Sequence, residues 1–138
     1  KTLHSTLLGL IHTGEIKSAH DCSEGGLAVT LAESCIAQQT ARETPRLIGA
    51  QIDLSGTKDV RLDALLFGET QNRIVITCAP LNATKVIERA KLMGVPAQRL
   101  GTVGGDALTV KTATGEFTVP VAELHDAWWN SIARAMGA

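Results

Sequence analysis

The sequence predicts an α+β fold in which helices pack with a mixed, mainly antiparallel sheet. Three patterns in the 138 residues support this prediction: amphipathic helical segments, apolar stretches with the spacing of strands, and a hairpin in the last third. Helices and strands mix without the strict alternation of a doubly wound parallel sheet, and the hairpin requires antiparallel pairing. Because a chain of this length can bury a core without metals or disulfides, we expect a single domain over residues 1–138.

The first half of the chain predicts three helices and two strands. An amphipathic helix begins near the N-terminus and ends at Gly14, a residue suited to the left-handed conformation after a helix. Residues 16–20 indicate a short strand, and residues 26–39 a helix with two adjacent apolar rows at spacing four. Over 48–54 apolar and polar residues alternate, as in a strand with one buried face, and 61–69 suggest a short helix.

The second half predicts a strand, a helix and then a set of strands. Residues 73–78 are apolar and β-branched, which suits a central strand. The next helix has Asn82 as a good N-cap and Gly94 as its terminator. Residues 97–105 indicate a strand with a glycine-rich turn, and 107–119 a hairpin that turns at 113–115.

A last helix is predicted from Pro120, whose ring fits a first helical turn. Apolar side chains recur near one face of it, at Val121, Leu124, Trp128, Ile132 and Ala135. Of the adjacent Trp128 and Trp129, we expect one to fill the core and the other to cover a neighbouring domain. The helix at the very start of the chain and the absence of an initial Met also suggest a fragment of a longer protein.

The composition argues against several classes of function. A net charge of −1 and only four aromatic residues give no footprint for nucleic acid. No apolar run approaches the roughly 18 residues of a membrane span, and no signal peptide is visible, so we expect a cytoplasmic protein with no membrane partner. The cysteines are odd in number and far apart, which predicts core thiols and no metal site: Cys22, Cys35 and Cys78.

The stretch Ser23, Glu24, Gly25 and Gly26 lies at the predicted start of a helix. The first N–H groups of a helix have no partner within it, and the helix dipole adds positive charge there, so anions bind at such starts. The two glycines would let a phosphate approach the backbone, and the Ser23 hydroxyl could cap the helix or bind the same anion. The alternative is an ordinary capped helix in which the glycines serve the turn.

A second polar cluster, "FGETQNR", precedes the apolar stretch over 73–78. It places Glu69, Thr70 and Gln71 at the edge of the predicted sheet, where loops often carry binding groups. Arg73 could contact phosphate or carboxylate in a bidentate manner. The alternative is a solvated turn with a structural salt bridge, for example between Arg73 and Glu69.

His20 and Asp21 suggest an acid–base pair by their adjacency alone. Neighbours along a strand point to opposite faces, so we do not expect the two side chains to meet. We assign no catalytic residue to this chain, and His20 and Asp21 stay candidates for lining a site.

Together, "SAHDCSEGGLAVTLAES" and, further on, "LFGETQNRIVIT" resemble the synthetase subunits of the phosphoribosylformylglycinamidine synthase family, in their last domain. The motifs, their order and the elements around them span nearly the whole chain. The resemblance implies the α+β fold shared with aminoimidazole ribonucleotide synthetase, selenophosphate synthetase and thiamine-monophosphate kinase. Both the small-subunit form and the large fused form of the family remain open.

The resemblance also implies chemistry. Such enzymes convert formylglycinamide ribonucleotide and glutamine-derived ammonia to formylglycinamidine ribonucleotide in purine biosynthesis. ATP and magnesium are bound mostly in preceding domains, and the partners are a glutaminase and a small adaptor subunit. An isolated last domain is therefore expected to be inactive.

By this resemblance, Ser23 to Gly26 bind the substrate phosphate, although the family often has Asp where this chain has Glu24. The stretch from Glu69 to Arg73 matches the pattern E-[ST]-Q-[GN]-R near the site. Two rival hypotheses remain: another ATP-using member of the superfamily, and a non-catalytic domain that serves packing and assembly.

Overall fold

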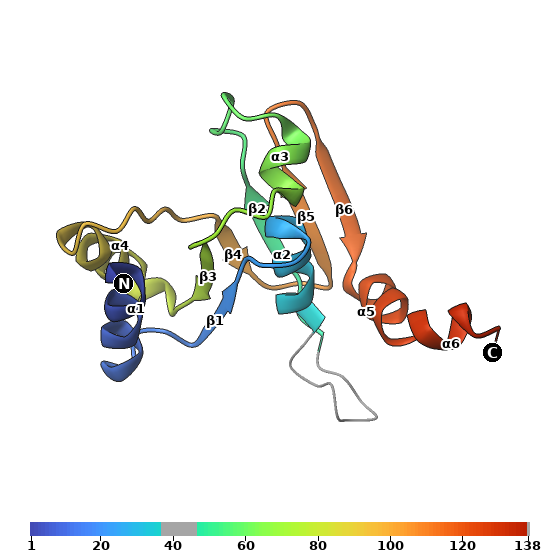
Figure 1. The fold of residues 1–138 in the computed structure, drawn as a ribbon, viewed down its shortest axis with the longest axis horizontal. Coiled ribbons are helices and arrows are strands. Elements are labelled where there is room, and N and C mark those ends of the chain that lie inside the picture. Colours follow the sequence, from blue (N-terminus) through green and yellow to red (C-terminus); the bar gives the residue numbers. More distant parts are fainter. Residues whose placement is uncertain (37–46, 138) are drawn as a thin grey trace. The chain divides into compact units, whose positions relative to one another are not determined.

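The computed structural model describes residues 1–36 and 47–137 (Figure 1). They form two compact units. The first consists of Lys1–Ser23 and Thr70–Arg99, and the second of Glu24–Glu69 and Leu100–Ala138. That the chain folds as a single domain stays a prediction.

The first unit combines two helices with a two-stranded sheet. Its elements are α1 (Thr2–His12), β1 (Ser18–Asp21), β3 (Ile74–Thr77), the 3-10 turn η2 (Pro80–Asn82) and α4 (Ala83–Leu92). The strands β1 and β3 are antiparallel, from Ser18 opposite Thr77 to Asp21 opposite Ile74. The prediction of a central strand at β3 is wrong: among the described residues it pairs with β1 alone, and its residues are half-buried. An apolar, β-branched sequence favours a strand but does not specify its neighbours.

The helices of the first unit begin and end close to the predicted residues. Gly14 and Gly94 both have φ of 75°, so each adopts the left-handed conformation expected after a helix. Asn82 occupies the N-cap position of α4, but its side chain makes no capping hydrogen bond, because η2 leads into the helix with helical backbone angles. Leu10 of α1 and Val86 and Ala90 of α4 are buried.

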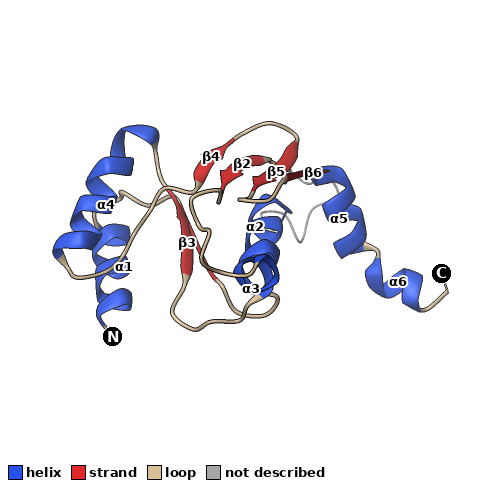
Figure 2. Cartoon of the chain, turned by 90° about the horizontal axis from the view of Figure 1, so that it is seen from above, coloured by secondary structure: helices blue, strands red, loops and turns tan. Residues whose placement is uncertain are grey.

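The second unit is a four-stranded sheet with helices. Its elements are α2 (Gly26–Ile36), β2 (Ala50–Asp53), α3 (Leu62–Phe67), β4 (Gly101–Val103), β5 (Ala107–Lys111), β6 (Glu116–Pro120), α5 (Val121–Trp129) and α6 (Ser131–Ala135). The strand order is β4-β2-β5-β6, with β2 and β5 parallel and the other neighbours antiparallel. This confirms a mixed, mainly antiparallel sheet. Figures 1 and 2 both show α2 and α3 on one face of it.

Alternating burial fixes which side chains face those helices. Ala50 and Ile52 of β2 are buried, while Gln51 and Asp53 between them are exposed. Leu108 and Val110 of β5 are buried and lie opposite Ala50 and Ile52 in the parallel pair. The predicted hairpin between β5 and β6 is confirmed, and the Thr112 N–H donates to the Gly115 carbonyl at 2.7 Å.

The predicted last helix differs from the structure in two ways. Pro120 is the residue before α5 rather than part of its first turn, and the helix is interrupted at Asn130, which separates α5 from α6. Trp128 and Trp129 are 40 % and 53 % exposed, so the prediction that one of them fills the core is wrong. Val121, at the start of α5, is the buried residue instead.

The remaining expectations concern α2, the cysteines and the membrane. The helix predicted over 26–39 is confirmed to Ile36, and 37–39 lie outside the described residues. The cysteines carry free thiols, with Cys22 and Cys35 buried and Cys78 half-buried, as expected of core thiols, and burial raises the pKa of Cys35. In the described ranges, no helix has the length and apolar character required to cross a membrane.

Candidate functional site

The Ser23–Gly26 turn leads into the N-terminus of α2. Gly25 and Gly26 have φ of 80° and 74°, the left-handed conformation that glycine adopts without a steric penalty. Ser23 and Glu24 are exposed, whereas Gly26 is buried. The structure therefore confirms a helix start at these glycines, and it leaves the polar side chains of the turn open to solvent.

Both glycines are also required by packing within the second unit. A Cβ atom at Gly25 would lie 2.4 Å from Cγ2 of Val29, one turn further along α2. A Cβ atom at Gly26 would lie 2.7 Å from the carbonyl carbon of Phe67 and 2.9 Å from the carbonyl oxygen of Gly68. The start of α2 thus packs directly on the backbone at the end of α3. The fold alone explains the glycine at position 26.

Glu69 has a contact that the sequence analysis missed. Its Oε1 atom accepts a hydrogen bond from the Gly25 N–H at 3.0 Å. A carboxylate at a helix N-terminus is favoured by the positive end of the helix dipole. Because the two residues are 44 positions apart in the chain, no local pattern could have paired them.

The part of the second motif from Thr70 onward belongs to the first unit. The Cys22 N–H donates to the Arg73 carbonyl at 2.8 Å, which extends the β1–β3 pairing by one step. Arg73 is half-buried, and Thr70 and Gln71 are exposed. The predicted site residues are thus distributed over both units, with Glu24 to Gly26 and Glu69 in the second unit.

Asn72 is a further feature that sequence reasoning overlooked. Its φ of 65° is left-handed, and it is the only described residue other than glycine with a positive φ. Asparagine tolerates this conformation better than most residues. The pattern E-[ST]-Q-[GN]-R carried the signal, because Gly and Asn are the residues suited to a left-handed position.

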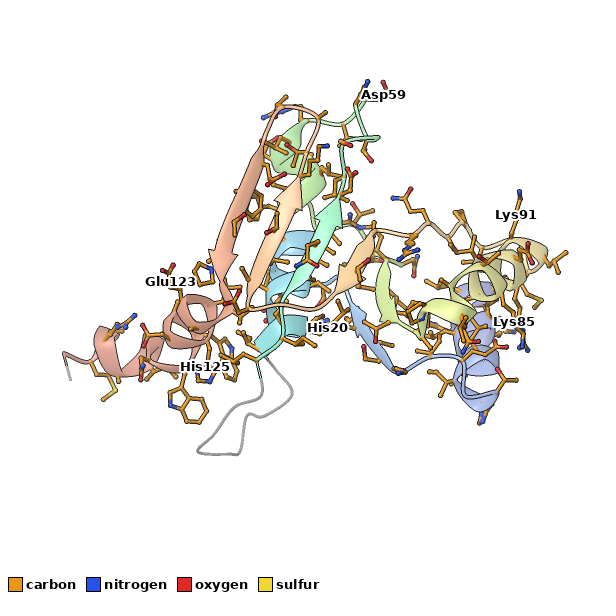
Figure 3. All side chains as sticks on the ribbon, turned by 180° about the vertical axis from the view of Figure 1, so that it is seen from behind. His20, Asp59, Lys85, Lys91, Glu123 and His125 are labelled. Carbon is orange, nitrogen blue, oxygen red and sulfur yellow. The ribbon has the colours of Figure 1, made fainter. Side chains whose placement is uncertain are left out.

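His20 and Asp21 lie in β1 of the first unit, where Figure 3 labels His20. The Nδ1 atom of His20 donates to the backbone carbonyl of Asp21 at 2.8 Å and lies 3.9 Å from its carboxylate. The expectation that the two side chains do not meet is therefore wrong at this distance. The shorter of the two contacts is to the backbone carbonyl.

Within residues 1–36 and 47–137, no group of three or more His, Cys, Asp or Glu side chains is placed to hold a metal ion. Mg²⁺ is often held by one or two carboxylates together with water and substrate phosphates, so this finding concerns only a site built from three or more protein ligands.

Comparisons with known proteins agree with the fold and the motifs. Residues 2–112 match the family model described as AIR synthase related protein, C-terminal domain. The phosphoribosylformylglycinamidine synthase subunit PurL of Anaeromyxobacter dehalogenans (strain 2CP-C) is 42 % identical over 134 residues, which are 96 % of this chain and 17 % of the relative. The PurL subunit of Thermobifida fusca (strain YX) is 41 % identical over 120 residues, 87 % of this chain and 14 % of the relative.

The fold has close counterparts among solved structures. T. maritima PurL complexed with ATP superimposes with a TM-score of 0.74 at 21 % identity, over 90 % of this chain and 21 % of that chain. T. maritima PurL complexed with FGAR gives the same TM-score and identity, over 90 % of this chain and 20 % of that chain. The predicted resemblance and fold class are confirmed. The chain spans less than a fifth of the length of the curated relatives cited here.

Proposed function

The chain belongs to the family described as AIR synthase related protein, C-terminal domain, and from this premise we propose its role. It acts as the last domain of a phosphoribosylformylglycinamidine synthase synthetase subunit. Identity of 42 % over nearly the whole chain supports this proposal, as do the two motifs in their order. Because the relatives are much longer, the reaction, the substrates and the partners of the whole protein are part of the proposal.

The proposed reaction is the ATP-dependent conversion of formylglycinamide ribonucleotide to formylglycinamidine ribonucleotide. The amide oxygen takes the γ-phosphoryl group of ATP and ADP leaves; ammonia from glutamine then attacks the amide carbon, loses a proton and displaces phosphate. A glutaminase supplies the ammonia, a small adaptor subunit is a further partner, and the proposed location is the cytoplasm. In this proposal, ATP and magnesium bind mostly in domains that precede this one.

The part we propose for this chain is to bind the phosphate of the ribonucleotide. The left-handed turn at Gly25 and Gly26, at the start of an 11-residue helix, is the observation that carries this proposal. The N–H groups of the first turn of α2 lack intrahelical partners, and the helix dipole favours an anion next to them. Gln71 and Arg73, in the first unit, are proposed separately as side chains that bind the ribonucleotide, Arg73 as a partner for phosphate oxygens.

A titration with ribose 5-phosphate and with inorganic phosphate tests this role. We expect the amide resonances of Gly25, Gly26 and Leu27 to shift on addition of either ligand, while the amide of Gly115 in the β5–β6 turn serves as the reference. A domain that serves only packing and assembly gives no response at the α2 turn. Equal shifts at the α2 turn and at Gly115 would also contradict the proposal, since they indicate unspecific binding.

A further inference from the structure

The acceptor of the Gly25 N–H is an anion that belongs to the protein. Glu69 follows the end of α3, and its carboxylate reaches the start of α2 at 3.0 Å. The backbone at Gly26 packs directly against the backbone of Phe67 and Gly68, and this packing holds the start of α2 close to the end of α3. The close packing of α2 on α3 therefore positions the Glu69 carboxylate next to the start of α2.

The Glu69 carboxylate occupies an N–H group that a phosphate bound at the start of α2 would also need. A phosphate at the start of α2 needs the N–H groups around Gly25 and Gly26, and one of these is already bonded to a carboxylate. Two anions that share one helix start repel each other, and each gains from the same dipole. Glu69 is exposed, so its side chain has room to move into solvent while the α2–α3 backbone packing stays in place.

We propose that Glu69 is an internal competitor of the substrate phosphate: it holds the Gly25 N–H in the free protein and is displaced when a phosphate binds. This inference rests on the proposed function and adds a residue that sets affinity. Before binding, the carboxylate keeps the left-handed turn ordered. On binding, the Gly25 N–H exchanges one anionic acceptor for another, and the Glu69 side chain turns to solvent.

The test compares three variants of the full chain: Glu69→Gln, Glu69→Ala and the control Glu116→Gln. Glu116 is an exposed residue of β6, so its variant removes the same charge away from the α2 turn. Circular dichroism and a thermal melt first establish that each variant is folded. The affinity for inorganic phosphate is then measured through the Gly26 and Leu27 amide resonances.

We expect Glu69→Ala to bind inorganic phosphate about tenfold more tightly than the wild type, which corresponds to about 1.4 kcal/mol. Glu69→Gln is expected to give a smaller gain, because its amide oxygen can still accept the Gly25 N–H but carries no charge. In the absence of phosphate, the Gly25 amide should exchange with solvent faster in Glu69→Ala. The control is expected to match the wild type in both measurements.

The possible results separate this inference from the proposed function. Phosphate binding by the wild type with equal or weaker binding by both Glu69 variants overturns the competitor role and leaves the phosphate site standing. Binding by none of the proteins overturns both. An equal gain in the Glu116→Gln control assigns the effect to net charge and also overturns the competitor role.

Discussion

The Nζ atom of Lys85 lies 2.7 Å from Oε1 of Glu15, so α4 supplies a cation to a carboxylate whose side chain is only 6 % exposed. Arg89, one turn further along α4, lies 3.4 Å from Oε2 of the same carboxylate. The hydrogen bond from Lys85 is the main cause that lowers the pKa of Glu15; burial opposes it, and the charges of Lys85 and Arg89 add to it.

The first prediction is that this ion pair makes the first unit sensitive to acid. A carboxylate whose pKa is lower in the folded than in the unfolded state stabilises the fold above its ordinary pKa of 4.5, and this contribution is lost as the pH falls through the lowered value. We expect Glu15→Gln to lower the melting temperature at pH 7 and to reduce the difference between the melting temperatures at pH 7 and pH 3. Thermal melts across this range measure both effects.

Lys85→Met provides the control for that prediction, because it keeps most of the unbranched side chain and removes the cation. The double variant Glu15→Gln, Lys85→Met should lose less stability than the sum of the single variants, since the two groups interact directly. Additive losses, or a wild-type pH profile that persists in Glu15→Gln, would contradict the role assigned to this pair.

The second prediction concerns Gly26, where the fold leaves no space for a side chain. The left-handed conformation alone costs an alanine about 1–2 kcal/mol, and the contact with the Phe67 backbone adds to this cost. We therefore expect Gly26→Ala to lower the free energy of unfolding in urea by at least that amount. Gly115→Ala is the matched control, since a Cβ atom there meets nothing within 4 Å and its φ is not left-handed. Equal stability of the two variants would show that α2 does not pack as described.

The parts of the fold that the sequence predicted are those set by local rules. The Gly14 and Gly94 helix ends and the β5–β6 hairpin follow from residue preferences that act within a few positions. The neighbours of β3 and the exposure of Trp128 depend instead on contacts between distant segments. A row of apolar residues along a helix predicts that this face of the helix is buried, but it does not say whether the residues that bury it belong to this chain.

The candidate site shows the same difference between features set by local residue preferences and features set by contacts between distant segments. The helix start at Gly25 and Gly26 was predicted from the sequence, because glycines and a following apolar row have a local meaning. The contact of Glu69 with Gly25 was not predicted, because it joins segments that meet only when α2 packs on α3. The left-handed Asn72 could have been predicted from the Gly or Asn alternation in its motif.

The third prediction separates Gln71 from Arg73. Arg73 is half-buried, so Arg73→Ala should lower the melting temperature through lost packing of its aliphatic stem. Gln71 is exposed, and Gln71→Ala should leave the stability within about 0.5 kcal/mol of the wild type. If the Gln71 side chain binds the ribonucleotide, the same variant weakens the binding of ribose 5-phosphate severalfold. Unchanged affinity in a fully stable Gln71→Ala protein would remove Gln71 from the proposed site.

The last prediction is that the 138-residue chain makes no formylglycinamidine ribonucleotide by itself but supports the reaction within a longer synthetase. The role proposed for the α2 turn is phosphate binding, and binding alone does not phosphorylate the amide oxygen of the substrate. The relatives devote most of their length to other segments, since the match covers 17 % of the Anaeromyxobacter dehalogenans subunit. A chimera in which this chain replaces the matched segment of that subunit provides the test.

The reaction mixture contains ATP, magnesium, formylglycinamide ribonucleotide and ammonium as the nitrogen source. By mass spectrometry, we expect product from the chimera and none from the chain alone. Product formation by the isolated chain would contradict the division of labour proposed here, and a folded chimera without activity would contradict the assignment to this enzyme.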